Sequence, residues 1–246
     1  MNNDTIAIIP ARSGSKSVKD KNITSLSGFP LIAYSIVVGY LVKSISRVIV
    51  STDSEDYAKI ARKFGAEVPF IRPTEISSDE SIDNDFFLHA MNWLSEHEGS
   101  VPEYWVHLRP TTPLRNPEII DNAINTIKSS NVATSLRSGH QCPESPLKWF
   151  SLDQDGYFKG FMNSDNNVDY SNQPRQNFPP VYIPNGYVDV VRASHVMKLD
   201  TLHGNNMIGF ESPAISEIDS IEELQYIQYQ LDRDGSLLLD DLKSRF

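Results

Sequence analysis

Cysteine and long apolar segments are scarce in this chain. Cys142 is the single cysteine among 246 residues, which excludes a disulfide framework or a cysteine-based zinc site within the chain. No run approaches the roughly 18 apolar residues that a membrane-spanning helix needs. The first residues, Asn2, Asn3 and Asp4, lack the basic and then apolar pattern of a secretory signal. We therefore expect a cytoplasmic protein with no membrane contact.

Positive charge is also in the minority. The 22 lysines and arginines are outnumbered by 32 aspartates and glutamates, which gives a net charge of -10. Proteins that bind nucleic acid need a basic surface against the phosphate backbone, so we expect no nucleic-acid partner. A cluster of cations near the N-terminus is unusual against this background, and it consists of Arg12, Lys16, Lys19 and Lys21.

The cationic cluster follows a short apolar run, residues 6–9, which predicts a buried parallel strand. Ser13, Gly14 and Ser15 let the backbone bend and bring its N–H groups close to a ligand. The spacing matches neither the Walker loop nor the dinucleotide Gly-x-Gly-x-x-Gly pattern. A solvated surface turn is the alternative. The position after a strand, where open α/β sheets bind ligands, favours a polyphosphate site.

Strand-like and helix-like segments alternate through the first half of the chain. Apolar runs predict strands at 47–52, 66–71, 104–108 and 132–136, and helical spacing predicts helices at 30–38, 54–64, 83–98 and 117–128. This order predicts an α/β fold in which helices cover a three-layer, mostly parallel sheet.

The middle of the chain departs from this pattern, because it is rich in Pro, Asn, Asp, Gln and aromatic residues. Short strands are predicted at 148–152 and 157–160, with a turn between them. A structureless loop of this length is unusual in a compact domain. We expect residues 138–184 to form a β-rich insertion that reaches a partner subunit or covers a site, within a single domain 1–246. Strands at 186–191 and 207–210 and a helix at 221–231 then resume the core.

A proline-rich turn, residues 109–115, follows one of the predicted strands. Its first arginine, Arg109, suits bidentate contact with a carboxylate or phosphate. Thr111 and Thr112 present hydroxyl groups, and the alternative is that they satisfy the backbone of the turn. For Arg115 the alternative is a structural role, in which it forms an ion pair.

Two acidic segments could bind Mg²⁺ beside phosphates. Glu217 and Asp219 are two residues apart and share a face of an extended segment, and Asp53 ends a predicted strand. For Asp53 and Asp219 the alternative is a helix cap, which each residue taken alone favours. The histidines show no metal-ligand spacing, and we expect His89 and His107 to be hydrogen-bonded core residues.

Several motifs together resemble one family. Residues 9–22 and the turn 109–115 are the specific ones, and weaker matches follow in the same order at 50–53, 72–73, 145–148, 174–176, 185–187 and 217–219. From end to end the chain resembles the acylneuraminate cytidylyltransferases, also called CMP-sialic acid synthetases. The resemblance implies a nucleotide-diphosphosugar-transferase-like fold and a homodimer in which the insertion reaches the neighbour's sugar pocket.

The resemblance also implies the reaction of CTP with a nonulosonic acid, an acidic nine-carbon sugar, to give a CMP-sugar and pyrophosphate. It implies catalytic roles for Arg12 and Lys21 and Mg²⁺ binding by Glu217 and Asp219. The nucleotide site that it implies consists of Ala11, Arg12, Ser13, Gly14, Ser15, Lys16, Lys21, Asn22 and Ser81. The sugar site consists of Arg109, Thr111, Thr112, Lys148, Arg175, Gln176 and Asn185.

Two positions depart from the family pattern. The family usually has Asp where Glu217 stands, and its sialic-acid branch usually has Gln where Arg109 stands. Arg109 together with residues 185–189 looks more like bacterial enzymes for legionaminic acid. The alternatives are the same chemistry on pseudaminic acid or an octulosonate, a guanylyltransferase acting on an aminosugar phosphate, and a non-catalytic nucleotide-sugar sensor.

Overall fold

A six-stranded sheet forms the centre of the molecule. The computed structural model describes residues 4–15, 18–162 and 167–246. The strand order is β10-β6-β9-β5-β1-β4. β9 runs antiparallel to both of its neighbours and the other pairs are parallel, so the predicted mostly parallel α/β sheet is confirmed. The strands are β1 (Thr5–Pro10), β4 (Arg47–Ser51), β5 (Tyr104–His107), β6 (Ser135–Gln141), β9 (Tyr182–Arg192) and β10 (Met207–Glu211).

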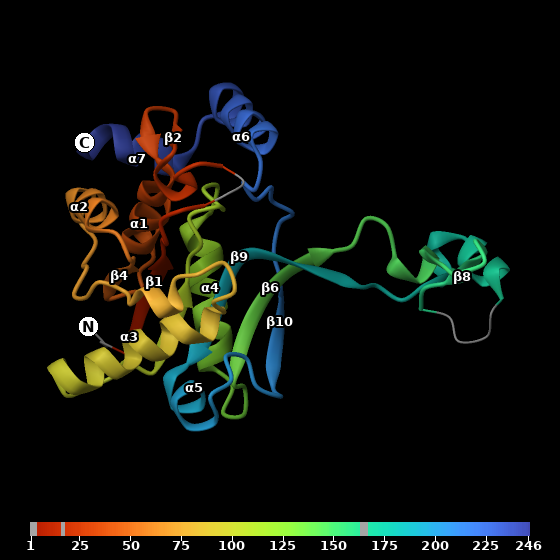
Figure 1. Ribbon diagram of the computed structural model, residues 1–246, viewed down its shortest axis with the longest axis horizontal. Coiled ribbons are helices and arrows are strands. Elements are labelled where there is room, and N and C mark those ends of the chain that lie inside the picture. The colour runs from red at the N-terminus through yellow and green to blue at the C-terminus, as the bar shows by residue number, and fades with distance from the viewer. Residues whose placement is uncertain (1–3, 16–17, 163–166) are drawn as a thin grey trace.

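Helices cover both faces of this sheet (Figure 1). They are α1 (Leu31–Leu41), α2 (Glu55–Lys63), α3 (Asp83–Glu98), α4 (Pro117–Lys128), α5 (Ala193–Leu199), α6 (Ile221–Asp234) and α7 (Leu237–Arg245). None of these helices, which belong to the described part of the chain, is long and apolar enough to span a membrane.

Strand β1 shows how the alternation of side chains builds the two cores. Ala7 and Ile9 pack in a cluster with α1, α2, α4, α6 and α7, whereas Ile6 and Ile8 pack with α3 and α5. All four side chains are fully buried, as expected for a central strand whose two faces are both covered. The burial of each isoleucine stabilises the fold by roughly 1.5–3 kcal/mol.

The structure corrects some of the predicted elements. Residues 66–71 make only one bridge, Ile49 to Glu67, because Pro69 has no N–H to continue a ladder. β6 begins at Ser135, since Val132 is exposed in a turn. Helices α5 and α7 were not expected, although Ser236 caps α7 and its leucines pack on the core.

Strands β6 and β9 continue beyond the sheet into an extension, residues 142–181, which we call the arm. Their register shifts between Arg137 and Gly139, and pairing then resumes as far as Gln141 and Tyr182. The described part of the arm contains the short hairpin β7 (Phe150–Leu152) and β8 (Phe158–Gly160) and lies well away from the helices (Figure 1). The arm falls within the range 138–184 predicted for the insertion.

Gly139 allows the two strands to approach closely at this bulge. A Cβ at Gly139 would lie 2.9 Å from the carbonyl oxygen of Ile183 on β9. A backbone oxygen within a ladder cannot move away easily, so we expect Gly139→Ala to lower the free energy of unfolding by about 1–3 kcal/mol. Urea denaturation followed by circular dichroism measures this loss.

The matched control is Gly209→Ala on the neighbouring strand β10, where an added Cβ meets nothing within 4 Å. We expect a change within about 0.5 kcal/mol for this variant. Equal losses in the two variants would show that the close approach of β6 and β9 is not what limits the side chain that position 139 accepts.

Candidate active site

A cleft opens at the carboxyl ends of the parallel strands β1 and β5, where α/β sheets bind ligands. Its volume is about 430 Å³. Three stretches that are distant in sequence line it: the loop after β1, residues 72–83, and the turn after β5. The structure thus brings together these predicted site residues: Arg12, Ser15, Lys21, Asn22, Ser81, Arg109 and Thr111.

The loop after β1 is anchored by Asp53, which follows β4. The Asp53 carboxylate accepts hydrogen bonds from the Ser13 N–H at 2.7 Å and the Ser13 hydroxyl at 2.8 Å. Ser54, and not Asp53, caps α2 by accepting from the Tyr57 N–H. The interpretation of Asp53 as a helix cap was therefore wrong: it shapes the loop.

These anchors also decide which loop groups remain for a ligand. The N–H of Ala11 donates to the Ser51 carbonyl at 2.9 Å, and the Asn22 amide donates to the Arg12 carbonyl at 2.9 Å. The backbone donors of Ala11 and Ser13 are thus already used. Gly14 has a positive φ of 71° and is exposed at the tip of the bend. Lys16 lies outside the described residues.

Each predicted catalytic cation is paired with a carboxylate. Arg12 Nη2 lies 2.6 Å from Asp79 Oδ1, and Lys21 Nζ lies 2.8 Å from Asp219 Oδ1. Asp219 is 198 residues beyond Lys21 in the chain. The structure therefore brings the cationic loop and the distant acidic segment to the same place, as the sequence analysis required.

The turn after β5 is held by Arg115. This buried guanidinium donates to the carbonyl oxygens of Arg109, Thr112, Gly186 and Tyr187. Burial, followed by the charge of Arg109, lowers its pKa. Arg115 is therefore structural, but backbone carbonyls take the place of the expected ion-pair partner.

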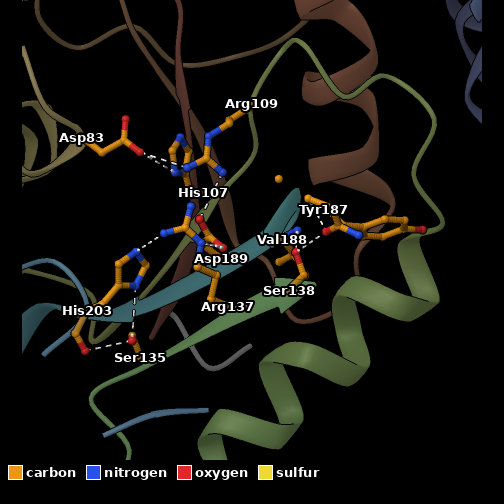
Figure 2. Close-up of polar contacts among 12 residues, drawn as sticks. Asp83, His107, Arg109, Ser135, Arg137, Ser138, Tyr187, Val188, Asp189 and His203 are labelled. Atoms are coloured by element: carbon orange, nitrogen blue, oxygen red, sulfur yellow. Dashed lines mark hydrogen bonds and ion pairs between the residues drawn. The ribbon is translucent and has the colours of Figure 1, made fainter. Parts of the chain in front are cut away.

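Arg109 lies in a network of charged groups that was not foreseen from the sequence (Figure 2). Its Nη2 lies 2.9 Å from Asp83 Oδ2, and its Nη1 lies 3.1 Å from Asp189 Oδ2. Burial alone would lower the pKa of Arg109, but the two carboxylates outweigh it and raise that pKa. On the far side of Asp189, Arg137 lies within 3.4 Å of the His203 ring.

The expectation for the two core histidines was wrong. Both ring nitrogens of His107, and Nδ1 of His89, have no hydrogen-bond partner among the described residues. The His107 ring makes edge-to-face contacts with both Phe86 and Phe87. Burial, followed by nearby Arg109, lowers the pKa of His107 well below its usual value, so the ring is neutral at pH 7.

Five predicted sugar-site residues do not line the cleft, and one of them, Thr112, is fully buried in the turn after β5. Asn185 is buried, where its side chain binds Ser138, Ser212 and the Pro213 carbonyl. The other three, which are Lys148, Arg175 and Gln176, lie in the arm (Figure 1). Lys148 donates to the Gln173 carbonyl at 2.7 Å, and Arg175 donates to the Cys142 carbonyl at 3.4 Å.

The two predicted metal ligands have different surroundings. Asp219 is largely exposed beside Lys21. The Glu217 side chain instead lies close to the backbone of β9, because a Cβ added at Gly186 would be 2.7 Å from Glu217 Oε1. Thr112, buried nearby, has a hydroxyl without a partner among the described residues. Within residues 4–15, 18–162 and 167–246, no group of three or more acidic, histidine or cysteine side chains could hold a metal.

Two curated proteins are similar to this chain over most of its length. The chain is 30% identical to the N-acylneuraminate cytidylyltransferase of Escherichia coli O18:K1:H7, over 98% of this chain and 50% of that protein. It is therefore about half as long as this relative. It is 32% identical to the CMP-N,N'-diacetyllegionaminic acid synthase of Legionella pneumophila, over 78% of this chain and 80% of that one.

A solved structure shares the fold. CMP:2-keto-3-deoxy-manno-octonic acid synthetase in complex with CTP superimposes with a TM-score of 0.71 at 14% identity, covering 94% of this chain and 99% of that one. A family model described as Cytidylyltransferase matches residues 6–236. Because that match spans almost the whole sequence, the chain belongs to the cytidylyltransferase family.

Proposed function

We propose that this protein transfers the cytidylyl group of CTP to the anomeric hydroxyl of a nonulosonic acid and releases pyrophosphate. The observation that carries the proposal is the meeting of Arg12, Lys21 and Asp219 beside a cleft that also contains Arg109. A reaction that consumes the cellular CTP pool belongs in the cytoplasm, so we place the protein there. The names of the relatives are consistent with the same substrate class.

The proposed chemistry needs positioning and charge neutralisation rather than covalent help. The sugar hydroxyl attacks the α-phosphorus in line with the departing pyrophosphate. Arg12 and Lys21 hold the phosphates and stabilise the negative charge that develops on the leaving group. Asn22 and Ser81, which both line the cleft, would contact the cytosine.

Mg²⁺ fits this arrangement through Asp219. Mg²⁺ prefers oxygen ligands, keeps several waters, and often takes one or two carboxylates together with substrate phosphates. Asp219 supplies such an exposed carboxylate at the cleft, and Glu217 would be the second. When bound, the metal would neutralise phosphate charge and lower the pKa of the attacking hydroxyl.

Legionaminic-type sugars are the substrates that we favour within the class. The Legionella relative, which is named for a diacetyllegionaminic acid, matches over 78% of this chain. Arg109 also stands where the sialic-acid branch usually has Gln.

We further infer a homodimer, because the arm exposes apolar side chains that a partner would cover. Among them, Leu152, Tyr157 and Phe158 are each more than 60% exposed. Such a concentration of apolar surface marks an interaction site. In the dimer, Lys148, Arg175 and Gln176 of one subunit would complete the sugar site of the other, next to that subunit's Arg109.

The proposed reaction is tested by pyrophosphate release with CTP, GTP, ATP or UTP and a panel of nonulosonic and octulosonic acids. We expect release with CTP and a nonulosonic acid. Lys21→Ala should reduce kcat/KM about 100-fold or more, because a cation that faces the leaving group is lost. Lys19→Ala removes an exposed charge from the same loop and should retain most activity. Pyrophosphate release with GTP but not with CTP would favour a guanylyltransferase.

The role of Asp219 is tested by the metal dependence of activity and by the binding of Mn²⁺ in the presence of CTP. We expect Asp219→Asn to raise the Mg²⁺ concentration for half-maximal activity roughly tenfold or more, since a direct ligand is lost. Electron paramagnetic resonance of Mn²⁺ with CTP measures the same loss without turnover. Unchanged Mn²⁺ binding would leave Asp219 as a partner of Lys21 only, and Glu217→Gln then tests the second carboxylate.

Sharing of the site between subunits is tested by mixing two inactive variants. Lys21→Ala impairs the cleft, and Arg175→Ala impairs the arm. After unfolding and refolding together, half of the dimers contain one subunit of each kind. One of the two sites in such a dimer is intact, so about a quarter of wild-type activity should return. No recovery, with a dimer confirmed by light scattering, would place Arg175 in the site of its own subunit.

A further inference from the structure

The Arg109 guanidinium lies between two carboxylates that differ in exposure. Asp189, on β9, is 1% exposed and fixes Nη1 from inside the protein. The Asp83 side chain, at the first residue of α3, is 42% exposed and meets Nη2 in the cleft. Figure 2 shows Arg109 in contact with both carboxylates, of which the buried one holds the guanidinium in place and the more exposed one meets it in the cleft.

We propose that Asp83 is a specificity-determining residue that occupies, in the free protein, the position on Arg109 taken by the carboxylate of the acid sugar. The inference rests on the proposed function. Binding then exchanges one carboxylate for another, so an anion gains affinity only if its other contacts compensate for displacing Asp83. Small carboxylates and inorganic anions, which make few other contacts, are thereby excluded.

Asp83 is free to leave Arg109 without disturbing its helix. The N-terminus of α3 is closed by Asp85, whose carboxylate accepts from the Ile82 N–H at 3.1 Å. The contacts of the Asp83 carboxylate are Arg109 and, at 3.8 Å, the uncharged ring of His107. Asp83 can therefore turn into the open cleft while Asp189 still neutralises Arg109.

Two other cations at the cleft are also paired with carboxylates. Arg12 is paired with Asp79, and Lys21 with Asp219. In each pair the side chain of the carboxylate is more exposed than that of the cation, at 39% against 34% and 69% against 14%. Paired in this way, the cations are already oriented before an anionic substrate arrives.

The test compares wild type with Asp83→Asn, which keeps the shape and one acceptor but loses the charge. With CTP saturating, we expect KM for the acid sugar to fall about three- to fivefold, the size of a partly exposed ion pair. KM for the sugar methyl ester, which has no carboxylate, should stay unchanged. Glu80→Gln, an exposed charge three residues away, is the control and should alter neither KM.

A second readout does not need turnover. Binding of N-acetylneuraminic acid and of its methyl ester is measured by calorimetry in the presence of Mg²⁺ and a CTP analogue whose bond between the α- and β-phosphates cannot be cleaved. Tighter binding of the acid alone by Asp83→Asn supports the inference even where no pyrophosphate is released, in which case only the proposed function fails. An unchanged or weaker affinity for the acid, or an equal change for acid and ester, overturns the inference, whether or not wild type is active.

Discussion

A buried guanidinium must find an acceptor for each of its donors, and this requirement shapes the centre of the molecule. Arg115 meets it with four backbone carbonyls, two from the turn after β5 and two from β9, and with the hydroxyl of Ser35 on α1. The same arginine thus ties the wall of the cleft to the strand that carries Asp189. Loss of these donors would leave the carbonyls unpaired and allow Arg109 to shift.

The cleft combines this rigid support with exposed charge pairs. Asp53 fixes the loop after β1 and Asp189 fixes Arg109, both from positions behind the site. Asp79, Asp83 and Asp219 lie in front, where solvent reaches them. An acidic protein can therefore present cations to polyanionic ligands, because its carboxylates are divided between those that support the cations and those that a ligand displaces.

Sequence patterns predicted the elements whose signal is local. The run at residues 6–9 marked the central strand, and helical spacing gave Asp83–Glu98 and Pro117–Lys128 at the bounds that the structure has. The antiparallel insertion of β9 could not be read in this way, because buried strands of either direction have the same apolar pattern. That Lys21 and Asp219 belong to one site came from the family resemblance, since a separation of 198 residues leaves no local signal.

The roles of Asp53 and Asp83 were missed for a related reason. An acidic residue after a strand or at a helix start looks like a cap, and Asp53 and Asp83 both occupy such positions. Only the folded chain shows that their partners are Ser13 and Arg109. His107 was assigned to the core by its neighbours in sequence, which say nothing of whether its ring nitrogens find partners.

One strand joins the arm to the centre of the cleft. β9 is an 11-residue strand, Tyr182–Arg192, which runs from the base of the arm through Asn185 and then through Asp189, the partner of Arg109. The strand is continuous between these two points, although its pairing with β6 changes register there. If the arm docks on a second subunit, ligand affinity in one subunit and subunit association become reciprocal quantities, as thermodynamic linkage requires. Dilution would then weaken sugar binding, and saturating sugar would slow the exchange of subunits.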